Sequence, residues 1–166
     1  MRPVLLGMNN PNSEYPEFSL YPDPPGCAGW NLWKHSGLSR EEYLEQFERM
    51  NMLNGRQWIP SHAREAAEEL RTTLASRTVV LLGEDVARLM WVGDTTPHYK
   101  WVCKPEGGWW AKIPHPSGRC RHWNDPWQRA AIQVFLGELV TLEGEPMSHD
   151  EPAPEVPEGG QLDLFG

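Results

Sequence analysis

Two polar sites that could do chemistry follow apolar runs near opposite ends of the chain. Asn9 and Asn10 come directly after PVLLGM, and His115 lies between Pro114 and Pro116, after WWAKI. A neutral imidazole held rigid in this way can donate a hydrogen bond to an oxygen that gains negative charge, a contribution of about 3–4 kcal/mol. A carboxamide can position a water but cannot act as a strong general base. The pair therefore suits a reaction driven by the departure of an anionic leaving group.

Both sites follow predicted strands. The runs PVLLGM and RTVVLLG contain or end at Gly7 and Gly83, and short apolar runs of this kind are typical of buried strands. The runs YKWVCK and WWAKI, separated by the turn signal PEGG, predict two more. Because strands alternate with helical segments, we expect an α/β fold: a three-layer sandwich with a mostly parallel central sheet. Ligand sites in such sheets lie at the carboxyl ends of the strands, where Asn9 and His115 would meet.

The helices are predicted from their caps and their periodicity. WNLWK opens a short helix, and Ser39 with Glu42 forms a capping box for a helix expected to run to about Met52. Further helices are expected over residues 62–75, over EDVARLM, and from Pro126, where Asp125 is the cap. Helical spacing predicts a core face on this last helix, formed by Trp127, Ala131, Val134, Phe135 and Leu139.

Charge is spread unevenly along the 166 residues. The net charge is −8, but from Thr141 onward there are seven acidic residues and no Lys or Arg, so residues 1–140 carry 16 acids against 15 bases. The folded part is therefore close to neutral, and the acidic total does not exclude a polyanionic partner. No apolar run of 18 residues and no leader segment is present, so we expect a cytoplasmic monomer without membrane contact.

The three cysteines form no CxxC pair, which argues against a disulfide framework and favours a reducing compartment. A zinc site built from Cys103, Cys120, His115 and His122 would fit no common ligand spacing. We therefore expect neither a metal ion nor a cofactor.

In order and spacing, these motifs resemble the uracil-DNA glycosylase superfamily, over residues 3 to about 140. Its mismatch-specific and single-strand-selective branches carry G-[IM]-N-P after the first strand and [HN]-P-S-[GP] after a late one. NLWK and VVLLGEDVARLM resemble two further segments of the mismatch-specific branch. The first motif departs by one extra residue: counting from Gly7 selects Asn9, whereas counting back from Pro11 selects Asn10. The end of the strand favours Asn9.

The resemblance implies hydrolysis of the bond between the sugar and uracil, or a related modified pyrimidine, after the base is flipped out of DNA. His115 would donate to O2 of the leaving base, and Asn9 or Asn10 would position water and read the base edge. Tyr21 is the expected stacking ring and Trp30 the second choice. The other expected substrate contacts are Gly7, Met8, Pro11 and Asn31.

DNA contacts are expected in the loop after the late strand. Arg119 follows HPSG, where the resemblance implies a wedge that fills the hole left by the flipped base. Lys112 and Arg129 would add positive charge for phosphates. The remaining expected contacts are Ser117, Gly118, Arg121 and His122.

The segment QLDLF resembles the peptide by which bacterial polymerases and repair proteins dock on the β sliding clamp. Leu162, Leu164 and Phe165 would be the apolar anchors, with Gln161 and Asp163 as the polar positions. We therefore expect a domain over residues 1–142, a disordered acidic linker over 143–160 and a clamp-binding tail over 161–166, in a bacterium or an infected bacterial host. Alternatively, the tail folds back on the domain as a last strand.

Two other functions stay open. A clamp-tethered protein could sense modified bases or block repair enzymes without catalysis, or an enzyme with this altered loop could act on hypermodified thymine. Each site residue also has a simpler explanation: His115 as a loop residue, the Asn residues as turn formers, and the basic residues as a solvated face.

Overall fold

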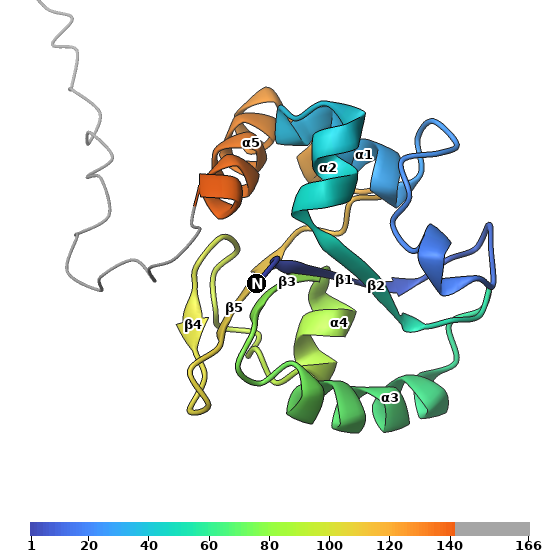
Figure 1. The fold of residues 1–166 in the computed structure, drawn as a ribbon, viewed down its shortest axis with the longest axis vertical. Helices are drawn as coiled ribbons and strands as arrows, with labels where there is room; N and C mark the ends of the chain where they lie inside the picture. The colour runs from blue at the N-terminus through green and yellow to red at the C-terminus, as the bar shows by residue number, and fades with distance from the viewer. Residues whose placement is uncertain (142–166) are drawn as a thin grey trace, which may run out of the picture.

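The computed structural model describes residues 1–141 and contains a five-stranded sheet with helices on both faces (Figure 1). The strand order is β2-β1-β3-β5-β4. Neighbouring strands are parallel except at the β4 edge, which is antiparallel to β5. The predicted α/β class and mostly parallel sheet are confirmed. The strands are β1 (Val4–Asn9), β2 (Glu48–Leu53), β3 (Thr78–Leu82), β4 (Val102–Cys103) and β5 (Trp109–Ile113).

Two helical layers cover the sheet. On one face lie α1 (Ala28–Ser36), α2 (Arg40–Gln46) and α5 (Pro126–Thr141), and on the other lie α3 (Pro60–Thr73) and α4 (Glu84–Leu89) (Figure 1). Two short 3-10 helices complete the described elements, η1 (Pro16–Phe18) and η2 (Arg121–Asn124).

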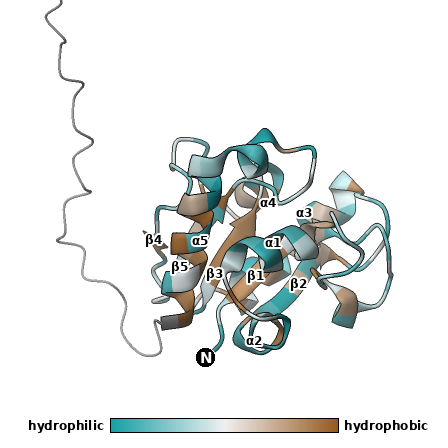
Figure 2. Ribbon diagram, turned by 90° about the horizontal axis from the view of Figure 1, so that it is seen from above, coloured by the Kyte–Doolittle hydropathy of each residue, from teal (hydrophilic) through white to brown (hydrophobic). Residues whose placement is uncertain are grey.

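Alternate residues of each strand serve the two layers. Leu5 and Val80 pack in the core beneath α1, α2 and α5, whereas Leu6 and Leu81 pack in the core above α3 and α4. Figure 2 shows the consequence: the central strands are hydrophobic, while much of the surrounding helical surface is hydrophilic. The apolar runs predicted as strands are therefore buried on both sides, as parallel strands require.

The helix predicted from Ser39 to Met52 was wrong in its second half. The capping box is present, with Ser39 N donating to Glu42 Oε2 at 2.7 Å and Glu42 N donating to Ser39 Oγ at 3.2 Å, but the helix ends at Gln46. Residues 48–53 instead pair with β1, from Val4 opposite Glu48 to Asn9 opposite Leu53. Strand pairing with β1 overrides the local helix propensity of this segment.

The last helix begins as predicted but buries a different face. Asp125 Oδ1 accepts hydrogen bonds from the backbone N–H groups of Trp127 and Gln128, at 2.8 and 3.2 Å. Trp127 and Val134, predicted as core, are exposed, and so is Ala131. The helix is apolar on more than one side, so its periodicity did not determine which face is buried. The buried residues are Ile132, Phe135, Leu136 and Leu139.

The predicted domain boundary at residue 142, the linker over 143–160 and the tail over 161–166 lie outside the described residues. Over residues 1–141, no helix is both long enough and apolar enough to cross a membrane.

Candidate functional site

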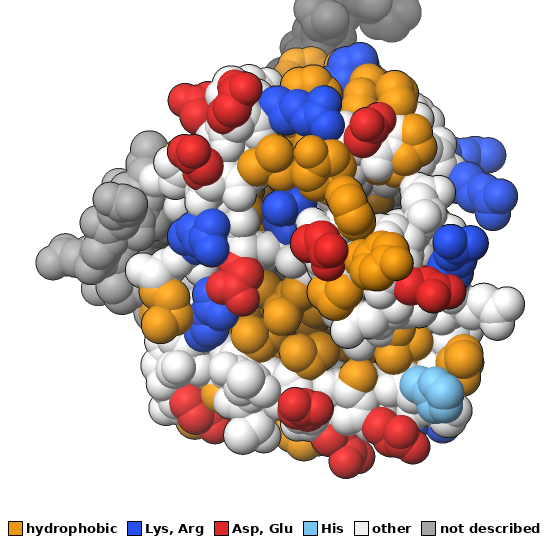
Figure 3. Space-filling model, turned by 45° about the vertical axis from the view of Figure 1, so that its right-hand side comes forward, with side chains coloured by type: hydrophobic (Ala, Val, Ile, Leu, Met, Phe, Trp, Pro, Cys, Tyr) orange, Lys and Arg blue, Asp and Glu red, His pale blue; other side chains and the backbone are white. Residues whose placement is uncertain are grey.

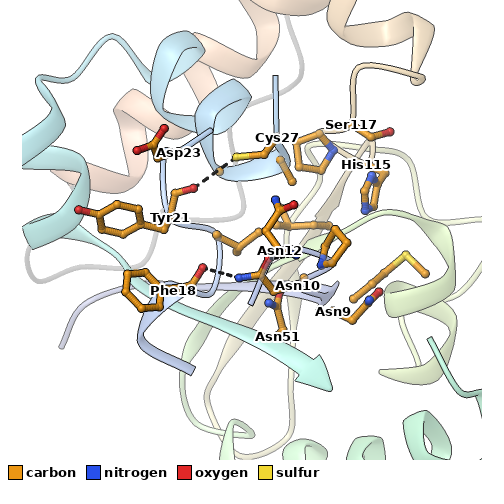
Figure 4. A pocket seen from close by; sticks show the side chains of 18 of the residues that line it. Asn9, Asn10, Asn12, Phe18, Tyr21, Asp23, Cys27, Asn51, His115 and Ser117 are labelled. Atoms are coloured by element: carbon orange, nitrogen blue, oxygen red, sulfur yellow. Dashed lines mark hydrogen bonds between the residues drawn. The ribbon is translucent and has the colours of Figure 1, made fainter. Parts of the chain in front are cut away.

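A cavity of about 350 Å³ lies where the parallel strands end. Its walls come from the ends of β1, β2 and β3, the loop after β5 and the amino end of α1. Figure 4 shows His115 and Ser117 on one side of it, with Phe18 and Tyr21 on the opposite side. Eight of the predicted site residues line this cavity: Gly7, Met8, Asn9, Asn10, Pro11, Tyr21, His115 and Ser117.

Two buried donors fix the loop that carries His115. Asn31 Nδ2 of α1 donates to the carbonyl of Pro116 at 2.8 Å, and Trp123 Nε1 of η2 donates to the carbonyl of Pro114 at 3.2 Å. The backbone is thus held on both sides of His115, which limits how far its ring can move. Asn31, predicted to contact substrate, is not among the residues that line the cavity. Its amide instead positions the histidine loop.

His115 packs against the end of β3. Gly83 has φ +95°, and a Cβ there would lie 3.0 Å from Cβ and 3.2 Å from Cδ2 of His115. Only glycine accommodates both this backbone conformation and the close approach of the ring. Gly83 therefore lets the imidazole reach the cavity.

The environment of His115 favours the neutral ring. Burial lowers the pKa of His115 below its ordinary value of 6.5, and the nearby Asp85 carboxylate only partly opposes this effect. Among residues 1–141, no hydrogen-bond partner is found for the ring. At neutral pH the side chain can thus present an N–H donor to a ligand in the cavity.

Asn9 and Asn10 are engaged differently. Asn9 Nδ2 donates to the carbonyl of Arg56 at 2.7 Å, and no described residue donates to its Oδ1. Both ends of the Asn10 amide are used by the loop itself: Nδ2 donates to the carbonyl of Phe18 at 2.9 Å, and Oδ1 accepts from Asn12 N at 3.0 Å. Asn10 therefore closes the loop that holds the extra residue, and Asn9 keeps an acceptor for a ligand or a water.

Asn51 on β2 is a cavity residue that the sequence did not indicate. It lines the cavity and is only 8% exposed, and its Oδ1 is buried with no hydrogen-bond partner among the described residues. It pairs with Gly7 across the sheet, and a Cβ at Gly7 would lie 2.5 Å from this oxygen. The missed signal was the strand itself: with the helix from Ser39 predicted to run to about Met52, Asn51 had no place at a strand end.

An aromatic wall closes the side opposite His115. The rings of Phe18 and Tyr21 meet edge to face at 5.6 Å, and the guanidinium groups of Arg40 and Arg49 lie 5.3 and 5.8 Å from the Tyr21 ring. These contacts hold the Tyr21 ring in place. Trp30, the second choice for stacking, is not among the cavity-lining residues, and the Lys34 ammonium lies over its ring at 4.3 Å.

The loop after β5 carries the predicted DNA contacts beyond Ser117. Gly118, Arg119, Arg121 and His122 are exposed there. Figure 3, which brings the right-hand side of Figure 1 forward, shows Lys and Arg side chains interspersed with Asp and Glu around hydrophobic groups. In this view, basic side chains do not form a continuous surface.

Lys112, predicted to add charge for phosphates, is not available to them. It is 2% exposed, and its Nζ lies 2.8 Å from Glu84 Oε2. His98 Nε2 lies 2.8 Å from Oε1 of the same carboxylate. Burial alone would raise the pKa of Glu84, but Lys112 and His98 hold it below its ordinary value. This cluster, in which only Lys112 is buried, ties the start of α4 to β5 and is structural.

The described residues contain no obvious set of metal ligands. No group of three or more His, Cys, Asp or Glu side chains among them could hold a metal ion.

No protein-family model matches the chain, and a search of curated proteins finds no match either.

Proposed function

We propose that the chain is a DNA glycosylase that hydrolyses the N-glycosidic bond of uracil, or of a related modified pyrimidine flipped out of DNA. The observation that carries this proposal is one cavity that Asn9 and Tyr21 share with His115, which lies far from both in the sequence. A hydrogen-bond donor, an acceptor for water and a flat aromatic wall are the groups that such a reaction needs.

In this mechanism the departing base leaves as an anion. His115, neutral because burial lowers its pKa, donates to O2 of the pyrimidine as negative charge develops there. The amino end of α1 borders the cavity at Cys27, Ala28 and Gly29, and the positive end of its dipole also favours an anion. Asn9 Oδ1 orients the water that attacks the sugar.

Asn51 gives the cavity a means of recognition. Its Nδ2, which is neither buried nor bonded to a described residue, donates to O4 of a uracil-type base. With the oxygen held beside Gly7, the amide presents only its donor to the cavity, which favours the O4 carbonyl of uracil over the amino group of cytosine.

The size of the cavity supports a second candidate, an enzyme for pyrimidines with larger substituents. A volume of about 350 Å³ falls within the range of about 300–1,000 Å³ typical of sites for drug-sized ligands. A cavity of this volume leaves room for a substituent on the base.

A strand-break assay tests the reaction. Oligonucleotides carrying uracil, 5-hydroxymethyluracil, hypermodified thymine or thymine, each opposite G and A, are incubated with the protein and then treated with alkali. We expect breaks that disappear in His115→Ala while DNA binding persists, and that remain in His62→Ala, a control on the exposed surface of α3. Binding without breaks on any substrate would support a sensor of modified bases instead.

We also propose recruitment to the β sliding clamp through Gln161–Phe165, a proposal that rests on the sequence because these residues lie outside those described. We expect the affinity of the full chain for the clamp to fall at least tenfold in Phe165→Ala, since a few anchors carry most of such binding. If the original chain and Phe165→Ala bind the clamp equally well, the clamp proposal is wrong.

A further inference from the structure

An apolar stripe on α5 faces outward. Trp127 is 84% exposed and Val134 61% exposed, and Ala130 and Ala131 between them are exposed as well. Residues at these spacings lie on one side of a helix. The stripe is therefore a continuous apolar surface rather than a set of scattered side chains.

The stripe forms one side of a groove with a rigid aromatic floor. A hollow of about 460 Å³ lies between α5 and Tyr99. Phe135 forms its floor and packs edge to face with Tyr99 at 5.7 Å and in a stack with Trp101 at 5.1 Å. We call this hollow, lined by Tyr99, Trp127, Ala130, Ala131, Val134, Phe135 and Glu138, the α5 groove.

The α5 groove shares no residue with the cavity at the strand ends, so the proposed reaction does not account for it. It is also small for a second copy of the chain. Stable interfaces use about 20–30 residues on each side, whereas seven residues line the groove. A short peptide with a few apolar anchors fits it better.

The chain supplies such a peptide within reach. α5 ends at Thr141, and the sequence continues to Gly166, with Leu162, Leu164 and Phe165 close together near its end. From Thr141 back to Trp127 the helix is about 21 Å long at 1.5 Å per residue. A flexible spacer of the length of residues 142–160 has a root-mean-square span of about 24 Å. The span of the spacer is therefore close to the length of helix that the peptide must pass to reach Trp127.

We propose that Leu162, Leu164 and Phe165 dock in the α5 groove of the same molecule. The tether gives these anchors an effective concentration of about 1 mM. If the isolated peptide binds the groove at about 0.1 mM, roughly ten molecules are docked for each free one, and the tail's apparent affinity for any outside partner falls about tenfold. This inference does not depend on the proposed reaction.

Photo-crosslinking of the full chain tests the docking. Val134 is replaced by p-benzoylphenylalanine, the protein is irradiated, and linked peptides are identified by mass spectrometry. We expect a monomer in which position 134 is joined to the peptide that contains residues 161–166. A covalent dimer, or links only to other segments, would overturn the proposal. The same probe at Glu69, exposed on α3 on the other face of the sheet, is the control and should not link to the tail.

A second set of variants tests the anchors without disturbing the domain. Leu164→Ser with Phe165→Ser should reduce the link from position 134 to the tail at least fivefold. Val156→Ser, an apolar change of similar kind within residues 142–160, should leave it unchanged. A link of unchanged yield in the double variant would also overturn the proposal.

Discussion

At the scale of single residues, Asn51 combines a disadvantage for folding with an opportunity for binding. Its Oδ1 is buried without a hydrogen-bond partner among the described residues, and a buried unsatisfied polar group costs about 1–3 kcal/mol. The amide nitrogen of the same side chain is the end that can reach a ligand in the cavity. Asn31 is the opposite case, because its buried amide already bonds to Pro116. The two asparagines should therefore respond differently to the same substitution.

We expect Asn51→Leu to raise the free energy of unfolding by about 1 kcal/mol, because it removes an unsatisfied polar group and keeps the number and branching of the side-chain heavy atoms. The same change should abolish uracil excision, if that activity is found. Asn31→Leu, the matched control, should lower the free energy of unfolding by about 1–3 kcal/mol, because Pro116 O loses its donor. Urea denaturation measures both. Equal destabilisation in the two variants would contradict this account of Asn51.

His115 should make stability depend on pH. Burial lowers its pKa in the folded state, whereas in the unfolded chain it protonates near its ordinary value of 6.5. Below about pH 6.5 the unfolded state therefore binds more protons than the folded state. The stability that the neutral His115 contributes is complete above that pH, and it is lost as the pH falls through the folded-state pKa. Between pH 7 and 5, His115→Asn should lose less unfolding free energy than the original chain. A loss as large in His115→Asn as in the original chain, by urea denaturation at each pH, would argue against a neutral His115.

At the scale of elements, the sequence predicted β1, β3, β5 and the cap of α5, because their signals are local: apolar runs, Gly83 at the end of β3, and Asp125 before Pro126. It failed for β2, where pairing with β1 outweighs helix propensity, and for the buried face of α5, which depends on packing against the sheet. The cavity residues show the same difference between local signals and long-range pairing. Asn9 and His115 were found from predicted strand ends, and Asn51 was missed together with its strand.

Gly83, between β3 and α4, gives His115 the space that its loop needs. In Gly83→Ala, the φ of +95° is strained and the new Cβ lies 3.0 Å from His115 Cβ, so the free energy of unfolding should fall by about 1–3 kcal/mol. The displaced imidazole should also weaken binding of a uracil-containing strand. Gly55→Ala is the control, since nothing lies within 4 Å of a Cβ there. A Gly83→Ala variant as stable as Gly55→Ala would show that the His115 loop adapts freely.

At the scale of the whole molecule, charge limits how DNA could be held. Residues 1–140 carry 16 acids and 15 bases, and basic and acidic side chains alternate on the surface drawn in Figure 3. Long-range attraction to phosphates is therefore weak. If the proposed function holds, affinity for DNA comes from a few local cations and from the flipped base inside the cavity, and Arg119 and Arg121, which follow β5, are exposed candidates.

Salt dependence tests this distribution. Each phosphate neutralised contributes about −0.9 to the slope of log K against log salt concentration, so two arginine contacts predict a shallow slope of about −2. Arg119→Ala and Arg121→Ala should each reduce its magnitude by about one. Arg2→Ala makes the same change in net charge just before β1, at the amino edge of the sheet away from the cavity, and should leave the slope unchanged. Titrating a uracil-containing duplex at several salt concentrations separates the two cases: if Arg2→Ala lowers the slope as much as Arg119→Ala, then overall charge holds the DNA, and the loop after β5 is an ordinary solvated surface.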